Sequence, residues 1–273
     1  MSRIRDRFNA LSKEGRKGLI AYITAGDPDL ETTMKLAVEF EKRGVSFLEL
    51  GVPFSDPLAD GKTNQEAAER ALKSGTTLKG ILKSVSGIRG TVTIPLIIFS
   101  YYNPIFKYGV EAFARDASEA GIDGALVLDL PPEECRPYKE AMRKSGLDTI
   151  FLVAPTSTAG RIQAITKVSG GFIYCLSRTG VTGEREAAME VVKTLTTRVR
   201  GFTDLPLAVG FGIATPEQAA AVARYADAVV VGSAIVRAIK RNIGRGDLVE
   251  RVGDFVETLV NGLPRSNQDI NNH

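Results

Sequence analysis

The stretch LPLAVGFGIATPEQAAAVARYADAVVVGS, residues 205–233, contains one complete unit of the pattern that decides the fold. An apolar run over 205–211 leads through a glycine-containing turn into a helical segment over 216–225, and a second apolar run follows at 227–233. Runs this short and this continuously apolar are typical of parallel strands that are buried on both faces. The unit therefore predicts two parallel strands joined by a helix.

The same alternation fills the whole chain. Strands are expected at 18–24, 46–52, 94–100, 124–130, 149–155, 171–177, 205–211 and 227–233. Helices are expected at 29–43, 63–88, 109–120, 133–145, 158–168, 184–199, 216–225 and 234–262, with an extra N-terminal helix at 4–14. Eight such units with right-handed crossovers predict an α/β fold, a (β/α)8 TIM barrel. An open doubly wound sheet is the alternative, but it needs a GxGxxG turn after the first strand, where this chain reads TAGDPD.

Length and composition set the broad class. The 273 residues suit one barrel domain over 1–263, followed by a polar tail at 264–273 that we expect to be disordered. The 35 basic and 32 acidic residues are interspersed, so nucleic acid is not indicated. No run reaches the roughly 18 apolar residues of a membrane span. The N-terminus lacks a signal peptide's apolar segment, and Cys135 and Cys175 are far apart in sequence, so we expect a cytoplasmic protein without disulfides.

Histidine chemistry is excluded from the fold, because the only histidine is His273, the last residue. Acid–base catalysis must then use carboxylates, Tyr, Lys or Cys. Glu49 is the first candidate, since it stands inside the apolar segment FLELGV, 47–52, where burial would raise its pKa toward neutrality. A glutamate paired with a lysine inside the barrel is the structural alternative. Asp56 and Asp60 follow in a proline-rich loop, where either a turn-forming or a catalytic role is possible.

Glycines after the last two expected strands predict a phosphate site. The seventh strand ends in the segment GFG, 210–212, and the eighth ends in Gly232 and Ser233, which open a helix. Glycine lets the backbone approach an anion closely, and a helix N-terminus offers free N–H groups. Phosphate groups bind at these two loops in many TIM barrels. The loop after the sixth strand, SRTGVTGER at 177–185, could add N–H groups to the same anion.

These motifs together resemble the tryptophan synthase α subunit family. The segments that carry the resemblance are YITAGDPD (22–29), ELGVPFSDPLADG (49–61), YYNPIF (101–106), DGALVLDLPPEE (123–134), APTS (154–157), SRTGVTG (177–183), GFGIATPEQ (210–218) and VVVGSAIV (229–236). The resemblance covers about residues 4–262, nearly the whole chain, and ELGVPFSDPLADG is its most specific part.

The resemblance implies a lyase of tryptophan biosynthesis that cleaves indole-3-glycerol phosphate to indole and glyceraldehyde 3-phosphate in a retro-aldol reaction. It implies that Glu49 delivers a proton to C3 of the indole ring and that Asp60 holds the indole N–H. It further implies substrate contacts from Tyr22, Tyr101, Tyr174, Thr182, Gly183, Phe211, Gly212, Gly232 and Ser233. The glycines and the serine of this set would hold the phosphate, Phe211 would wall the indole, and Thr182 would belong to a loop that closes over the site.

A partner is implied by the same resemblance: a β subunit that carries pyridoxal phosphate, in an α2β2 heterotetramer, with no cofactor and no metal in this chain. Pro53 and Asp56 are expected at the partner contact. The chain departs from the family pattern at Lys62 and Asn64, which replace a proline and an apolar residue. Contacts with the partner, or the rigidity of this loop, could therefore differ from those of the family.

Two other functions remain open at this point. Another phosphate-binding barrel, such as an isomerase or a synthase, would share the loops after strands seven and eight. Such an enzyme typically uses a lysine at a strand end, and none of the expected strands ends in lysine. A non-catalytic barrel that only regulates a partner would have no need of both Glu49 and Asp60.

Overall fold

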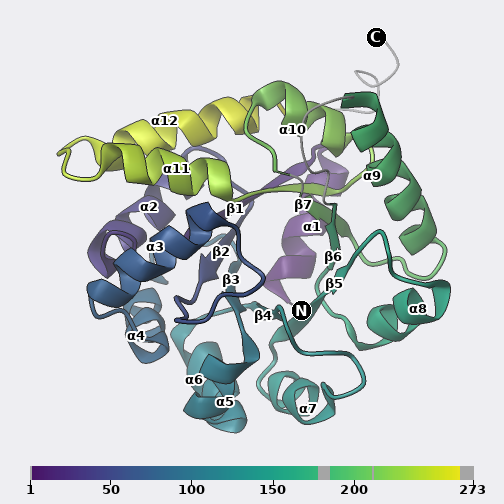
Figure 1. The fold of residues 1–273 in the computed structure, drawn as a ribbon, viewed down its shortest axis with the longest axis horizontal. Helices are drawn as coiled ribbons and strands as arrows, with labels where there is room; N and C mark the ends of the chain where they lie inside the picture. Colours follow the sequence, from purple (N-terminus) through teal and green to yellow (C-terminus); the bar gives the residue numbers. More distant parts are fainter. Residues whose placement is uncertain (1, 178–184, 211, 265–273) are drawn as a thin grey trace.

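A computed structural model describes residues 2–177, 185–210 and 212–264 of the chain. All eight strands are parallel and pair in chain order, and β1 also pairs with β8, which closes the barrel (Figure 1). The strands are β1 (Gly18–Thr24), β2 (Phe47–Gly51), β3 (Leu96–Ser100), β4 (Gly124–Val127), β5 (Asp148–Val153), β6 (Ile173–Leu176), β7 (Leu207–Gly210) and β8 (Ala228–Val231). The predicted TIM barrel is confirmed, with one strand in every expected apolar run.

Helices form the outer layer of the barrel in Figure 1. They are α1 (Arg3–Lys13), α2 (Leu30–Lys42), α3 (Lys62–Lys73), α4 (Leu78–Ile88), α5 (Tyr102–Tyr108), α6 (Val110–Ala120), α7 (Arg136–Lys144), α8 (Ala159–Val168), α9 (Arg185–Arg200), α10 (Pro216–Ala223), α11 (Ser233–Asn242) and α12 (Leu248–Asn261). Their apolar faces and the outward side chains of the strands make the larger of the buried clusters.

The predicted helix boundaries are wrong at three places. The segment 63–88 is two helices, because Gly75 has φ +80° and Thr77 then caps α4 by accepting a hydrogen bond from the N–H of Gly80. The segment 234–262 is divided in the same way at Gly244, which has φ +84°. The helix α5 was not expected, since its seven residues span too few turns to show a period in the sequence.

The extra N-terminal helix is confirmed as α1, and it closes the N-terminal end of the barrel. The ring centroid of Phe8 lies 4.5 Å from that of Phe47 and 5.8 Å from that of Phe172. Ile4 and Leu11 belong to the same buried cluster, which fills the barrel interior. A polar ligand can therefore reach the interior only from the C-terminal ends of the strands, where catalytic residues of TIM barrels are found.

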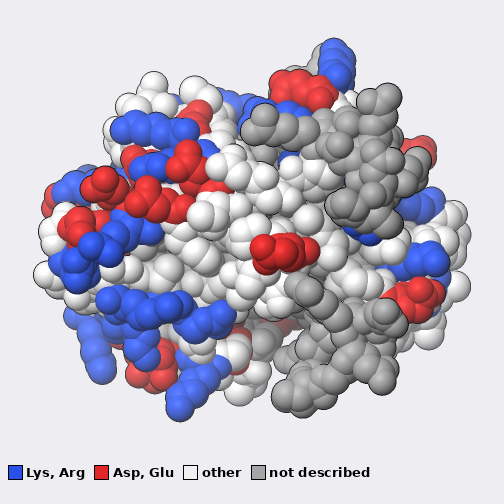
Figure 2. Space-filling view, turned by 90° about the horizontal axis from the view of Figure 1, so that it is seen from above, with Lys and Arg blue, Asp and Glu red and all other residues white. Residues whose placement is uncertain are grey.

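The surface carries charged side chains of both signs. On the face drawn in Figure 2, basic and acidic side chains are mixed at the upper left, basic side chains predominate at the lower left, and few charged side chains lie at the centre. Among the helices that the structure describes, none combines the length and the apolar content needed to cross a membrane. Cys135 and Cys175 are both buried and unpaired. Of the expected tail, residues 265–273, including His273, lie outside the described part of the chain.

Candidate active site

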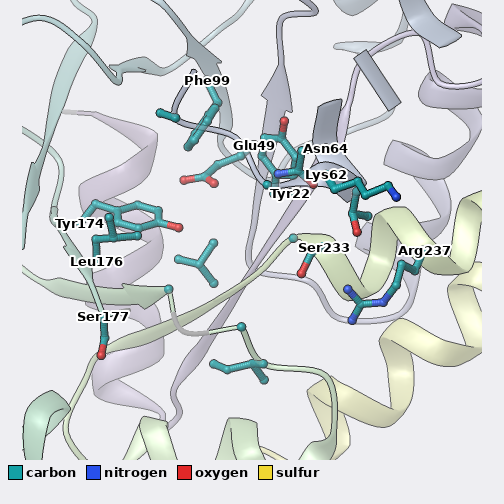
Figure 3. A pocket seen from close by; sticks show the side chains of 18 residues that line it. Tyr22, Glu49, Lys62, Asn64, Phe99, Tyr174, Leu176, Ser177, Ser233 and Arg237 are labelled. Carbon is teal, nitrogen blue, oxygen red and sulfur yellow. The ribbon is translucent and has the colours of Figure 1, made fainter. Parts of the chain in front are cut away.

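A cavity of about 490 Å³ opens at the C-terminal ends of the strands. Residues of six strands and of the first turns of α3 and α11 make its wall (Figure 3). The lining residues are Tyr22, Glu49, Ala59, Gly61, Lys62, Thr63, Asn64, Phe99, Tyr174, Leu176, Ser177, Gly210, Gly212, Ile213, Val230, Gly232, Ser233 and Arg237. The cavity thus combines an apolar and aromatic part with a part that carries glycines and basic side chains.

Glu49 is the carboxyl group inside this cavity. It lies in the middle of β2, in register with Tyr22 of β1 and Ile97 of β3, and it is fully buried. Neither carboxyl oxygen has a hydrogen-bond partner among the described residues. Burial raises the pKa of Glu49 to about 8, and none of the described cations offsets it. The structural alternative, a glutamate paired with a lysine, is therefore wrong, and the group can give and take a proton near neutral pH.

Tyr22 and Tyr174 stand on either side of Glu49 in Figure 3, and two glycines make room for them. A Cβ atom at Gly51 would lie 2.3 Å from the hydroxyl oxygen of Tyr22, and one at Gly210 would lie 2.3 Å from that of Tyr174. Any side chain at either position would displace the ring beside it. Gly210, which the sequence placed with the phosphate loop, therefore also has a steric role that no local motif indicated.

Asp60 lies in the loop after β2, between two lining residues, Ala59 and Gly61, and beside Tyr101. The Tyr101 hydroxyl donates a hydrogen bond of 3.1 Å to Oδ2 of Asp60 and accepts one of 2.9 Å from the N–H of Ala59. Burial raises the pKa of Asp60, while hydrogen bonds from Tyr101 and Asn64 act to lower it. Neither Asp60 nor Tyr101 is itself part of the cavity wall in this structure.

The other end of the cavity is suited to an anion. Gly212 has φ +55°, and the described residues leave the space beside its Cα open. Gly232 is the N-cap of α11, and Ser233 begins that helix. The first turn of α11 leaves N–H groups without helical partners, and the positive end of the helix dipole favours negative charge there. Figure 3 shows Arg237 on the same side of the cavity as Ser233.

Arg237 is a lining residue that the sequence analysis missed. Within the described ranges, its guanidinium group forms neither an ion pair nor a hydrogen bond. The sequence could have indicated Arg237 through its position four residues after Ser233, because residues four apart in a helix share a face. Lys62 also lines the cavity.

The structure describes only some of the remaining predicted site residues. Thr182, Gly183 and Phe211 lie outside the described residues. Pro53 is buried within the chain, whereas Asp56 is exposed and accepts a hydrogen bond of 2.5 Å from the Ser55 hydroxyl. Within the described ranges, no cluster of three or more His, Cys, Asp or Glu side chains has the arrangement of a metal site.

Comparison with known proteins decides which family this geometry represents. The sequence model of the family described as "Tryptophan synthase alpha chain" matches residues 8–261. The chain belongs to the tryptophan synthase alpha chain family. A tryptophan synthase alpha chain from Citrifermentans bemidjiense is 52% identical over 263 residues, which is 96% of this chain and 98% of that protein. The one from Geotalea uraniireducens is also 52% identical, over 264 residues, 96% of this chain and 98% of the relative.

Solved structures of the tryptophan synthase alpha family agree with the fold. The subunit from Legionella pneumophila is 37% identical and superimposes with a TM-score of 0.89, over 96% of this chain and 98% of that one. A chain of tryptophan synthase from M. tuberculosis, in an aminoacrylate-bound form, is 35% identical, with a TM-score of 0.86, over 97% of this chain and all of that one. At these sequence identities the similarity supports membership of the same family as well as the same fold.

Burial of Glu49 predicts a stability that depends on pH. With a pKa of about 8 in the folded chain and about 4.3 when unfolded, the folded state binds more protons between these values, so stability falls as pH rises through this window. The side chain at position 49 of the Glu49→Gln variant does not titrate. The free energy of unfolding of this variant, relative to that of the parent, should therefore increase by about 1.4 kcal/mol per pH unit in this window. Urea unfolding from pH 5 to 8 measures this gain.

The matched control for this prediction is Glu119→Gln, which changes an exposed glutamate of α6. This variant should follow the parent over the whole pH range. If the Glu49→Gln variant runs parallel to the parent as well, Glu49 is not held protonated by burial.

Proposed function

We propose that this chain cleaves indole-3-glycerol phosphate to indole and glyceraldehyde 3-phosphate, as the α subunit of tryptophan synthase, with Glu49 and Asp60 as its catalytic residues. One observation carries the assignment of the residues: a fully buried carboxyl group without a partner stands in a cavity that has an aromatic part and an anion-binding part. Family membership argues against the isomerase and synthase alternatives, which belong to other barrel families. The two carboxyl groups at the site argue against a barrel that only regulates.

The proposed reaction needs only proton transfers. Glu49, protonated near neutral pH, delivers its proton to C3 of the indole ring. Asp60 accepts a hydrogen bond from the ring N–H and offsets the positive charge that forms on the ring. The carboxylate left on Glu49 then takes the proton of the neighbouring glycerol hydroxyl, while the carbon–carbon bond breaks and the aldehyde forms. The protons balance, and Glu49 ends in the state in which it began.

Each part of the substrate has a matching part of the cavity. The indole would lie among Tyr22, Phe99, Tyr174 and Val230, whose rings and methyl groups bury apolar surface near Glu49. The phosphate would lie against Gly212, Gly232 and Ser233 at the start of α11, with Arg237 as an additional positive charge. Chemistry of this kind requires no cofactor in this chain. Pyridoxal phosphate would belong to the β partner, and we expect the complex in the cytoplasm.

A partner surface is proposed around the loop after β2. Leu58 in this loop is 94% exposed and Phe106 of α5 is 65% exposed, which is unusual for large apolar side chains. The loop is joined to the start of α5 through the hydrogen bonds of Tyr101. Asp56 is exposed beside Leu58, whereas Pro53 is buried and would support the loop from beneath. The β subunit would cover this surface and hold the loop over the substrate.

Glu49→Gln should abolish indole release, because Gln keeps the shape of the side chain but cannot carry a proton. General acid–base groups contribute about 10²–10⁴-fold, so kcat should fall at least about 100-fold. Binding of glyceraldehyde 3-phosphate, measured by calorimetry, should stay close to that of the parent. Turnover within tenfold of the parent would remove Glu49 from its proposed role.

Gly212→Asp should weaken binding of glyceraldehyde 3-phosphate, because a carboxylate would face the phosphate. Gly212→Asn is the matched control, since Asn has the same size, is neutral and tolerates the positive φ of this position equally well. The Asp variant should bind at least about tenfold more weakly than the Asn variant, as expected for a disrupted charge-assisted contact. Equal affinities for the two folded variants would place the phosphate elsewhere.

Asp56→Ala should reduce activation by a tryptophan synthase β subunit and leave the basal rate of the isolated chain nearly unchanged. The reason is that Asp56 is exposed on the proposed partner surface and has no contact with the cavity. Titrating the β subunit against a fixed amount of chain, with indole release as readout, measures the activation. Asp6→Ala, an exposed acid on α1 at the opposite end of the barrel, is the control, and equal activation curves for all three chains would contradict the assignment.

A further inference from the structure

Asn64 is a lining residue of the cavity that the proposed mechanism does not use. It lies in the first turn of α3, where its backbone N–H donates to the carbonyl of Gly61 at 2.9 Å. Its side-chain amide lies near Asp60 and acts by hydrogen bonding to lower the pKa of that carboxyl. A carboxylate only accepts hydrogen bonds, so the amide nitrogen of Asn64 must be the atom that faces Asp60. The amide oxygen, Oδ1, therefore points away from Asp60.

Oδ1 of Asn64 is buried and has no hydrogen-bond partner among the described residues. An unsatisfied buried polar atom costs free energy, and such atoms are rare in proteins unless a ligand or water completes them. An apolar residue at this position would fill the space without this cost. A side chain at the cavity wall with a buried and unsatisfied amide oxygen points to a donor on the bound ligand.

The donors of the substrate can be assigned one by one. Indole-3-glycerol phosphate offers the ring N–H and two hydroxyl groups, and its phosphate dianion offers none. In the proposed reaction Asp60 takes the ring N–H and Glu49 takes the hydroxyl next to the ring. The second hydroxyl, nearer the phosphate, has no partner. Figure 3 shows Asn64 and Lys62 on the same side of the cavity as Ser233, where the phosphate is proposed to lie.

We propose that Asn64 is a positioning residue that bridges Asp60 and the substrate: its amide nitrogen holds the Asp60 carboxylate, and its Oδ1 accepts a hydrogen bond from the second glycerol hydroxyl. This inference rests on the proposed function. It makes Asn64 part of substrate recognition in this chain.

The contact with the hydroxyl is tested by binding to chains that cannot turn the substrate over. Glu49→Gln serves as the background, and Asn64→Ile is added to it. Isothermal calorimetry compares indole-3-glycerol phosphate with indole-3-propanol phosphate, which lacks both hydroxyls. Asn64→Ile should weaken binding of the first ligand about 3- to 10-fold, as expected for one lost hydrogen bond, and leave binding of the second unchanged. Equal effects on both ligands, or no effect on either, would overturn this contact.

The contact with Asp60 is tested by the pH dependence of kcat/KM. Asp60 acts in its ionised form, so loss of the Asn64 hydrogen bond should move the acidic limb to higher pH. The other titrating groups around Asp60 do not interfere with this limb. Burial raises the pKa of Tyr101 to about 12 and that of Tyr22 further, and Glu49 titrates at about 8, on the basic side. Lys62, in the same turn of α3, is unchanged by the substitution.

Two variants and one control complete the design. Asn64→Ile should move the acidic limb up by about half to one pH unit, and Asn64→Asp, which also adds a like charge, should move it further. Asn64→Asp is nearly isosteric, so it keeps the test valid if the Ile variant folds poorly. Glu69→Gln, an exposed change on α3, should leave the limb where it is. An unmoved limb in both Asn64 variants overturns the positioning role, whereas absence of indole release by the parent chain contradicts the proposed function itself.

Discussion

The carboxyl group of Glu49 sets the conditions for the rest of the site. A fully buried carboxyl group without a hydrogen bond is tolerated because it can remain protonated, and it remains protonated only while its surroundings are apolar and free of a nearby cation. The closed end of the barrel supplies part of this environment, since α1 fills it with Ile4, Phe8 and Leu11. A lysine in that space would ionise Glu49 and remove the proton that the reaction needs.

The space around Glu49 depends on two glycines as well as on the aromatic rings beside it. Tyr22 and Tyr174 can stand beside it because Gly51 and Gly210 on the neighbouring strands have no Cβ atom. Each glycine lies on the neighbouring strand, two residues beyond the register partner of the tyrosine whose hydroxyl end it accommodates. The aromatic wall therefore depends on pairs of neighbouring strands. A side chain at either glycine would displace a tyrosine ring and so change the surroundings of Glu49 without contacting Glu49 itself.

Two ion pairs hold the walls of the cavity in relation to one another. Arg70 of α3 binds both oxygens of the buried Asp27, at 2.7 and 2.8 Å, which ties the helix that carries Asn64 to the turn after β1. Lys240 of α11 binds Glu66 of α3 at 2.6 Å. The second pair is exposed and contributes little free energy, but the first is bidentate and largely buried. The helix α3, which follows the loop that carries Asp60, and the helix α11, which begins at the phosphate side of the site, are thus joined to each other.

The sequence by itself determined the barrel and its central acid. Eight short apolar runs separated by helical periods leave few other folds, and a single glutamate inside FLELGV is visible without a structure. The tertiary structure alone decided that Asp60 meets Tyr101, 41 residues away, that Gly210 makes room for Tyr174, and that Arg237 and Asn64 reach the same cavity. The periodic spacing of apolar residues shows which face of a helix or strand is buried, because each segment must place its own apolar residues on the buried face. Contacts among loops from different strands depend on closure of the barrel, and no segment of the chain encodes that closure alone.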